Sequence, residues 1–110
     1  MKYPNAREII AHGGRVALAT DFNPGTSPTQ SLNFVGVLAR LEMKMSLAEV
    51  YSAFTIGGAY ALGLEKSIGV VAPGYSADLA VFDADWDQLF YQVGFHPINM
   101  VFYRGRKVTA

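Results

Sequence analysis

The 110-residue sequence contains no cysteine, which excludes a disulfide framework, a cysteine zinc site and thiol catalysis. It has no excess of either charge, because nine Lys and Arg balance nine Asp and Glu. A net charge of zero gives no electrostatic reason to expect nucleic acid or an anionic membrane as partner. No apolar run approaches the ~18 residues of a membrane span, and no apolar signal region follows the first residue. We therefore expect a cytoplasmic protein.

Apolar residues are plentiful for so short a chain, at 51% against 16% charged residues. A globule of this size buries roughly 65% of the surface that its unfolded chain exposes. Much apolar surface therefore stays outside unless something covers it, and balanced charge gives little repulsion against association. We expect part of this surface to be covered in the working protein, and a homo-oligomer is one way to cover it.

Helix capping signals lie in the first half of the chain, at Asn5, Ser27 and Ser46. Each is followed three residues later by Glu or Gln, which is the spacing of a capping box. Glycines follow the first and last of these segments and can end helices. The predicted helices span residues 6–12, 28–45 and 47–62, the last interrupted at residues 57–58.

Residues 15–20, Arg-Val-Ala-Leu-Ala-Thr, contain a continuous apolar run that is typical of a strand covered on both faces, as in a parallel sheet. No second strand of this kind follows, and one strand cannot make a sheet. We expect it to pair outside this chain, with a second copy, or with the C-terminal strands. On pattern alone, a small α+β domain whose hairpins cover the helices also fits.

The second half of the chain is rich in predicted strands, whereas the first half is mostly helical. Residues 68–71 and 77–82 flank a Pro-Gly turn at 73–74 and predict a hairpin. Residues 83–93 can hold a short helix, and residues 100–108 predict a second hairpin around Arg-Gly-Arg. The chain thus divides near Leu64 into a helical part, 1–64, and a strand-rich part, 65–110.

The loop after the predicted strand holds the candidate site. Asp21 is a carboxylate at the strand's end, where it could bind a metal or act as a general base. Asn23, Gly25 and Thr26 could offer an amide, a backbone N–H and a hydroxyl to a polar ligand. The alternative for all four is turn chemistry, in which the loop bonds only to itself.

Other polar residues give weaker evidence of a functional site. His12 and His96 are isolated and form no metal-binding pair, so we assign both a structural role. Asp83, Asp85 and Asp87 alternate near a tryptophan but lack the ligand pattern of a calcium loop, so they predict a solvated turn.

Residues 16–29, Val-Ala-Leu-Ala-Thr-Asp-Phe-Asn-Pro-Gly-Thr-Ser-Pro-Thr, resemble the last barrel strand and loop of the imidazolonepropionase family, in the metal-dependent amidohydrolase superfamily. Residues 68–83 and 101–108 resemble that superfamily's return strands. The resemblance implies an α/β fold. Residues 1–64 would end a (β/α)8 barrel, and residues 65–110 would supply closing strands of a small β-sandwich domain.

The resemblance also implies a reaction, hydrolysis of the ring amide of 4-imidazolone-5-propanoate to N-formimino-L-glutamate in histidine degradation. Asp21 would bind the catalytic metal, zinc or iron, and serve as base toward its water. Asn23, Gly25 and Thr26 would hold the small-molecule substrate or product.

The family's metal-binding histidines have no counterpart in this sequence, and neither His12 nor His96 matches them. We therefore expect a C-terminal portion that is inactive and holds no metal tightly by itself. Two alternatives stay open: a non-catalytic, self-associating module, and a fragment of another cyclic-amide amidohydrolase.

Overall fold

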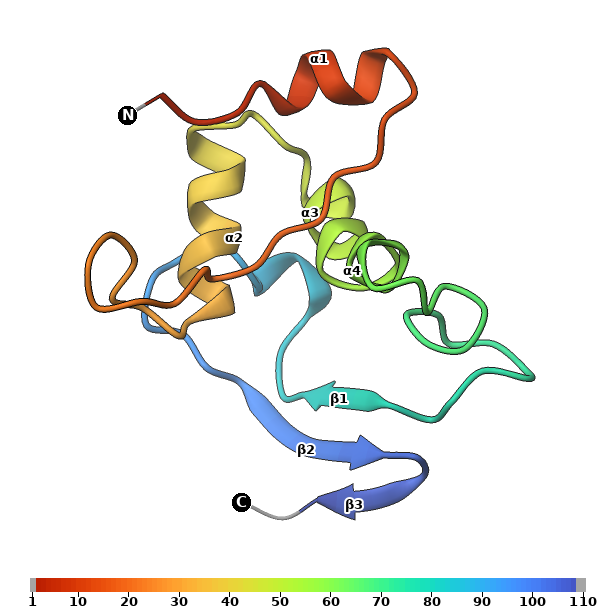
Figure 1. Cartoon of the computed structure of the whole chain (residues 1–110). Coiled ribbons are helices and arrows are strands. Elements are labelled where there is room, and N and C mark those ends of the chain that lie inside the picture. The colour runs from red at the N-terminus through yellow and green to blue at the C-terminus, as the bar shows by residue number, and fades with distance from the viewer. Residues whose placement is uncertain (1, 109–110) are drawn as a thin grey trace.

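A computed structural model describes residues 2–108 as four helices and a small sheet (Figure 1). The helices are α1 (Ala6–Ala11), α2 (Leu32–Leu41), α3 (Leu47–Phe54) and α4 (Ile56–Ala61), and a 3-10 turn spans Trp86–Gln88. The strands are β1 (Leu79–Phe82), β2 (Ile98–Tyr103) and β3 (Arg106–Val108). The chain is thus a small α/β piece with a three-stranded antiparallel sheet of order β1-β2-β3.

Two of the predicted helix caps are present. The Asn5 side chain accepts a hydrogen bond from the backbone N–H of Glu8 and opens α1. Ser46 and Glu49 form the reciprocal capping box that opens α3. Both caps satisfy amide groups that a helix leaves unpaired at its first turn. Gly63, with φ at +69°, follows α4 and ends it as expected.

The predicted start of the second helix is wrong. Ser27 does not cap it, because its hydroxyl donates to the carbonyl oxygen of Thr20 at 2.6 Å and so belongs to the preceding loop. The cap is Ser31, whose hydroxyl accepts from the backbone N–H of Phe34 at 3.1 Å. The helix also ends earlier than expected, at Leu41 rather than near Met45.

The third predicted helix is interrupted two residues before its glycine pair. Thr55 has φ −107° and ψ −94°, outside the helical region, and separates α3 from α4. Gly57 lies inside α4 and is buried against the segment that precedes the candidate site. A β-carbon there would lie 2.3 Å from the carbonyl oxygen of Val16, so glycine allows the close approach.

The first predicted hairpin is wrong. Residues 68–70 form bends rather than a strand, and β1 pairs with β2 instead, with a register irregularity between Val81 and Phe82. The Pro-Gly turn itself is present: the N–H of Tyr75 donates to the carbonyl of Ala72 at 3.2 Å. The last hairpin is confirmed as β2 and β3. Arg104 and Gly105 both have positive φ, as a type I′ turn requires.

The core lies among the helices and is small. Its buried members are Ala6, Ala39, Met45, Val50 and Ala53. Val50 is the only large side chain in residues 2–108 with essentially no exposure. Most of these residues are alanines, so the core fills little volume for a chain with 51% hydrophobic residues.

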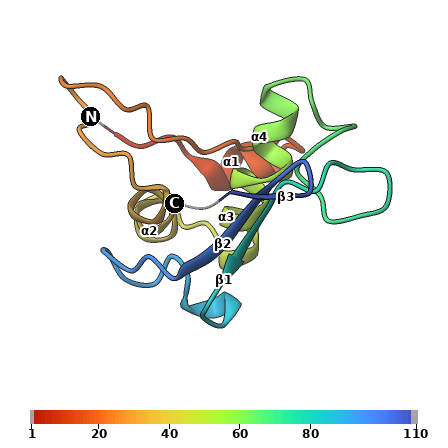
Figure 2. The ribbon, with the colours of Figure 1, turned by 90° about the horizontal axis from the view of Figure 1, so that it is seen from below.

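An aromatic contact attaches the second half of the chain to the helices. The ring of Phe90 packs against Tyr51 and Phe54 of α3, with centroid separations of 5.2 and 5.3 Å. It also lies over Gly36 of α2, where a β-carbon would come within 2.3 Å of the ring. Arg40 donates to the Phe90 carbonyl at 3.1 Å. In Figure 2, which is seen from below, β1 and β2 run in front of α3.

Residues 15–20 run extended past the helices but pair with no strand within residues 2–108. The segment therefore does not pair with the C-terminal strands, and its pairing outside this chain stays a prediction. Val16 and Leu18 pack against the core, whereas Ala17 and Ala19 on the opposite face are exposed.

Across residues 2–108, no helix has the length and apolar content that a membrane crossing needs.

Candidate functional site

The candidate site is the loop that follows the extended segment, beginning at Asp21. Asp21 has a left-handed backbone conformation, with φ at +49°, which turns the chain sharply at this point. Asp and Asn adopt this conformation more readily than most residues. The hydroxyl of Ser27 holds the carbonyl of Thr20, so the end of the loop is bonded back to its beginning.

The Asn23 side chain organises the loop. Its Oδ1 atom accepts from the backbone N–H of Gly25 at 2.9 Å and of Thr26 at 2.7 Å, and more weakly from the Thr26 hydroxyl at 3.3 Å. Its Nδ2 atom donates to the carbonyl of Asp21 at 2.7 Å. The backbone N–H of Asn23 donates to the carbonyl of Ser27 at 3.0 Å. These bonds fix the loop with its own groups.

The structure brings the four predicted site residues together in one turn, but three of them bond to one another. The N–H groups of Gly25 and Thr26 and the Oδ1 atom of Asn23 are engaged within the loop. Asp21 is exposed, and its carboxylate makes no hydrogen bond to any group in residues 2–108. Among the side chains of these four residues, the Asp21 carboxylate is therefore the group that keeps its full binding capacity.

The donor set around Asp21 does not fit a resident metal by itself. A catalytic metal needs about three protein ligands. In the described part of the chain, no three His, Cys, Asp or Glu side chains gather in a way that could hold a metal ion. His12 bonds to the carbonyl of Glu8 in its own helix, at 2.8 Å. These residues alone therefore do not supply a metal site for catalysis.

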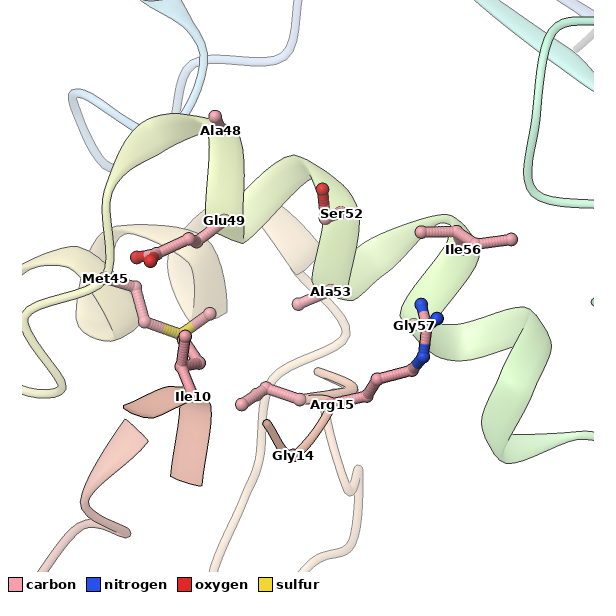
Figure 3. Close-up of a pocket in the computed structure, with 11 residues that line it drawn as sticks. Ile10, Gly14, Arg15, Met45, Ala48, Glu49, Ser52, Ala53, Ile56 and Gly57 are labelled. Carbon is pink, nitrogen blue, oxygen red and sulfur yellow. The ribbon is translucent and has the colours of Figure 1, made fainter. Parts of the chain in front are cut away.

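A cavity of about 250 Å³ lies beneath residues 14–16, between α1, α3 and α4 (Figure 3). Figure 3 shows Ile10 and Met45 on one side of it and Arg15 on the other. The Arg15 guanidinium lies 3.9 Å from the ring centroid of Tyr60, a cation–π contact that orients the side chain along α4. The cavity is mostly apolar and contains none of the four predicted site residues.

An ion pair closes the α1 side of that region. Arg7 of α1 donates to the carboxylate of Glu49 on α3. The hydrogen bond from Arg7, with a further one from the Ser46 backbone, lowers the pKa of Glu49 below its ordinary value of 4.5. The pair links α1 to α3 and so positions the N-terminal end of the extended segment.

A larger cavity, of about 560 Å³, separates the helices from β1 and β2. Its lining is mostly apolar, and its polar side chains include Asn33 of α2 and Tyr51 of α3. Both amide atoms of Asn33 are buried and lack a hydrogen-bond partner in residues 2–108. Burial raises the pKa of the Tyr51 hydroxyl above 10.0. We did not predict Asn33 as a site residue. The available signal was a polar residue within the apolar run Leu-Asn-Phe-Val.

Comparison with known proteins identifies the class. A model of the Amidohydrolase family matches residues 2–92, which is most of the chain. The chain belongs to the amidohydrolase family. Within it, the chain is 62% identical over 107 residues to the imidazolonepropionase of Bdellovibrio bacteriovorus, and 45% identical over 108 residues to that of Solibacter usitatus. These relatives confirm the resemblance drawn from residues 16–29.

The matches cover 97% of this chain but only 25% and 26% of those two relatives. The chain thus spans about a quarter of the length of the curated relatives that it matches. The comparisons favour imidazolonepropionase over another member of the superfamily, because the relatives named here share that name.

Solved structures show the same fold. An adenosine deaminase from Xanthomonas campestris with bound zinc superposes with a TM-score of 0.85 at 24% identity, over 96% of this chain and 28% of that one. An amidohydrolase from Thermotoga maritima gives 0.71 at 22% identity, over 94% and 25%. At identities of 24% and 22%, these structures show a similar fold and nothing about function.

Proposed function

We propose that this chain is the C-terminal part of an imidazolonepropionase. The complete enzyme would hydrolyse the ring amide of 4-imidazolone-5-propanoate to N-formimino-L-glutamate, in histidine degradation. One observation carries the proposal: 62% identity to an imidazolonepropionase over 97% of the chain, including the loop that begins at Asp21. By itself the chain would be inactive, because its described residues supply a single free carboxylate at that loop.

The loop geometry supports distinct roles for its residues. Asp21 would supply a carboxylate to the reaction site, where a carboxylate can accept a proton and return it to a leaving nitrogen. Asn23 would hold the loop in shape through its bonds to Gly25 and Thr26. The Nδ2 group of Asn23 and the hydroxyl of Thr26 keep hydrogen-bonding capacity for a polar substrate. The metal, zinc or iron, would be held in the complete enzyme by Asp21 together with ligands from outside this chain.

We also propose a placement in the complete fold. Residues 1–64 would form the last strand and helices of a (β/α)8 barrel, with residues 15–20 as that strand. Residues 65–110 would add β1, β2 and β3 to a small β-sandwich domain. The separation of helices and sheet in Figure 1, and the likeness to two solved amidohydrolases, support this division.

A chimeric enzyme tests the function. The matched quarter of the Bdellovibrio bacteriovorus relative would be replaced by this chain, and hydrolysis of 4-imidazolone-5-propanoate would be followed. We expect turnover by the chimera, none by the isolated chain with added zinc or iron, and a loss of at least a hundredfold for Asp21→Asn, the low end of a general base's contribution. Asn tolerates the left-handed conformation at this position, so the fold should survive.

Asp83→Asn is the matched control, because Asp83 is also an exposed carboxylate directly after a strand. It should leave turnover unchanged. Full activity of the Asp21→Asn chimera would contradict the role of that carboxylate, and an inactive but folded wild-type chimera would contradict the proposed function itself.

A further inference from the structure

We propose that Ser27 is a positioning residue for the Asp21 carboxylate. It aims that carboxylate through the backbone, by holding the peptide group that precedes Asp21, and touches no substrate itself. The reaction that the carboxylate serves rests on the proposed function. The link between the two residues rests on the geometry of this chain alone.

The backbone decides where the Asp21 side chain can reach. Asp21 is exposed, and the hydrogen bonds of this turn engage its carbonyl oxygen rather than its carboxylate. No side-chain partner within residues 2–108 therefore orients the carboxylate. The rotamers open to a side chain depend on φ and ψ, and for so short a side chain the direction of the Cα–Cβ bond sets its reach. Whatever fixes φ and ψ at Asp21 therefore also aims the carboxylate.

Both peptide groups that flank Asp21 are held by hydrogen bonds. The Ser27 hydroxyl donates to the carbonyl of Thr20 at 2.6 Å, and Nδ2 of Asn23 donates to the carbonyl of Asp21 at 2.7 Å. A peptide group is planar, so holding the groups on both sides leaves little freedom for φ and ψ between them. Ser27 is itself fixed, because its carbonyl accepts from the Asn23 N–H at 3.0 Å.

The conformation held in this way is a strained one. Asp21 has φ at +49°, in the left-handed region that L residues enter only at an energetic cost. Asp can offset this cost when its side chain bonds locally, but the carboxylate of Asp21 makes no such bond within residues 2–108. Without the Ser27 hydroxyl, we expect Asp21 to relax to a negative φ, which would turn the carboxylate in another direction.

Ser27 separates positioning from binding better than Asn23 does. The Asn23 side chain holds the amides of Gly25 and Thr26 as well, so its loss disturbs the whole loop. A serine hydroxyl has one hydrogen to donate, and that of Ser27 is already donated to Thr20. Removing it should therefore change the rate of the reaction and leave substrate binding almost unaltered.

Kinetics of the chimeric enzyme test the proposal. Ser27→Ala should lower kcat about tenfold or more, since a small misplacement of a reacting group can cost about a hundredfold. KM should change less than about twofold, because binding contacts are kept. In the Asp21→Asn background, Ser27→Ala should lower kcat less than about twofold further, because the carboxylate that it positions is already absent. A crystal structure of the Ser27→Ala chimera should show Asp21 with a negative φ.

Two variants serve as controls. Ser27→Thr keeps the hydroxyl and should keep most of kcat and the positive φ of Asp21. Thr55→Ala removes a bond of the same kind elsewhere, because the Thr55 hydroxyl donates to the carbonyl of Tyr51 at 2.7 Å. It should leave kcat unchanged. If Ser27→Ala does not fold, Ser27→Cys takes its place, since a thiol of similar size is only a weak donor.

The outcomes distinguish this proposal from the proposed function. Wild-type kcat in Ser27→Ala, an equal loss in both backgrounds, or a φ of Asp21 that stays positive would overturn the role of Ser27. A raised KM with unchanged kcat would also overturn it, because the hydroxyl would then bind substrate. A wild-type chimera that folds but is inactive would contradict the proposed function, and the φ of Asp21 in the two structures would still decide whether Ser27 holds it.

Discussion

Two parts of this molecule are extended, and they differ in what holds them. β1, β2 and β3 bond to one another in an antiparallel sheet, although much of their surface is exposed. Residues 15–20 contain an apolar run and pack one face on the helices, yet they have no neighbouring strand within residues 2–108. An extended segment becomes a strand of a sheet only when its backbone bonds to a neighbouring segment. An apolar run predicts extended chain, but only a partner's backbone makes it part of a sheet.

The supports of the two extended parts also differ. The sheet is held by its turn at Arg104 and Gly105 and by Asp78, whose carboxylate accepts from the Arg104 backbone N–H at 2.8 Å. The segment at 15–20 depends on contacts from other elements at each end and along one face. Substitutions at those contacts should therefore detach the segment while leaving the sheet paired.

The largest effect is expected at Gly57. Gly57→Ala places a β-carbon 2.3 Å from the carbonyl oxygen of Val16, and neither backbone can move freely. The clash should destabilise the chain by roughly 3 kcal/mol in urea unfolding, the upper part of the usual range for overpacking.

Gly58→Ala is the matched control, because its β-carbon would meet only the carbonyl oxygen of Ala53, at an ordinary 3.9 Å. It should stabilise α4 by about 0.5–1 kcal/mol. Equal unfolding midpoints for the two variants would show that the segment does not rest on α4.

The C-terminal end of the segment is expected to loosen in Asn23→Ala. The substitution removes the acceptor of the Gly25 and Thr26 amides and the donor to Asp21. We expect a loss of about 1 kcal/mol, with faster hydrogen exchange at both amides and unchanged exchange in β2. Asn23→Asp keeps the acceptor and should retain most of the protection. Unchanged exchange in Asn23→Ala would mean that other groups hold the loop.

A smaller, pH-dependent effect is expected at the N-terminal end, where Arg7 bonds to Glu49. The pKa of Glu49 is lower in the folded chain than in the unfolded one, mainly because of Arg7. Its contribution is therefore complete above pH 4.5 and is lost as the pH falls through the folded pKa. The pair is partly exposed, so the effect should stay below about 1 kcal/mol.

Melting curves between pH 6 and pH 3 test this link. Glu49→Gln and Arg7→Gln should each flatten the acid side of the profile. If both variants kept the acid profile of the wild type, the ion pair would not contribute to holding the segment.

The smallest effect is expected in the sheet. Arg104→Asn should stabilise the β2–β3 hairpin and leave residues 15–20 unchanged. Arg104 has φ at +49°, and Asn followed by Gly is the preferred pair for a type I′ turn. The gain should be a few tenths of a kcal/mol, with slower exchange of the hairpin amides and no change at residues 15–20. Faster exchange in the hairpin would show that the Arg104 side chain stabilises it.

Local rules predicted those elements whose causes lie within a few residues. The caps at Asn5 and Ser46 and the last hairpin are present because a side chain or a turn determines each of them. Ser27 satisfied the same capping rule, yet its hydroxyl bonds to Thr20, seven residues earlier. β1 likewise pairs with a strand that begins sixteen residues after it ends. Local sequence patterns could not predict these two contacts, because the bonding partner of each lies far away in the sequence.

The candidate site shows the same division. The residues from Asp21 to Thr26 were expected to form a turn from their composition, and they form one. Whether they contact a ligand stays a prediction, because residues 2–108 bring no cluster of metal-binding side chains to this loop. Asn33 was missed because its buried, unpaired amide is visible only once α2 is packed in place.

The small core has a thermodynamic consequence. Heat capacity rises on unfolding because apolar groups become hydrated, by about 1.3–1.7 kcal/mol/K for an ordinary domain of 110 residues. A chain with a small core, in which Val50 is the one large side chain of residues 2–108 that is fully buried, hydrates fewer new apolar groups when it unfolds. Its heat-capacity increment and its urea m-value should both fall below the ordinary range. Its melting transition should be broad, because a small buried core gives a small enthalpy of unfolding.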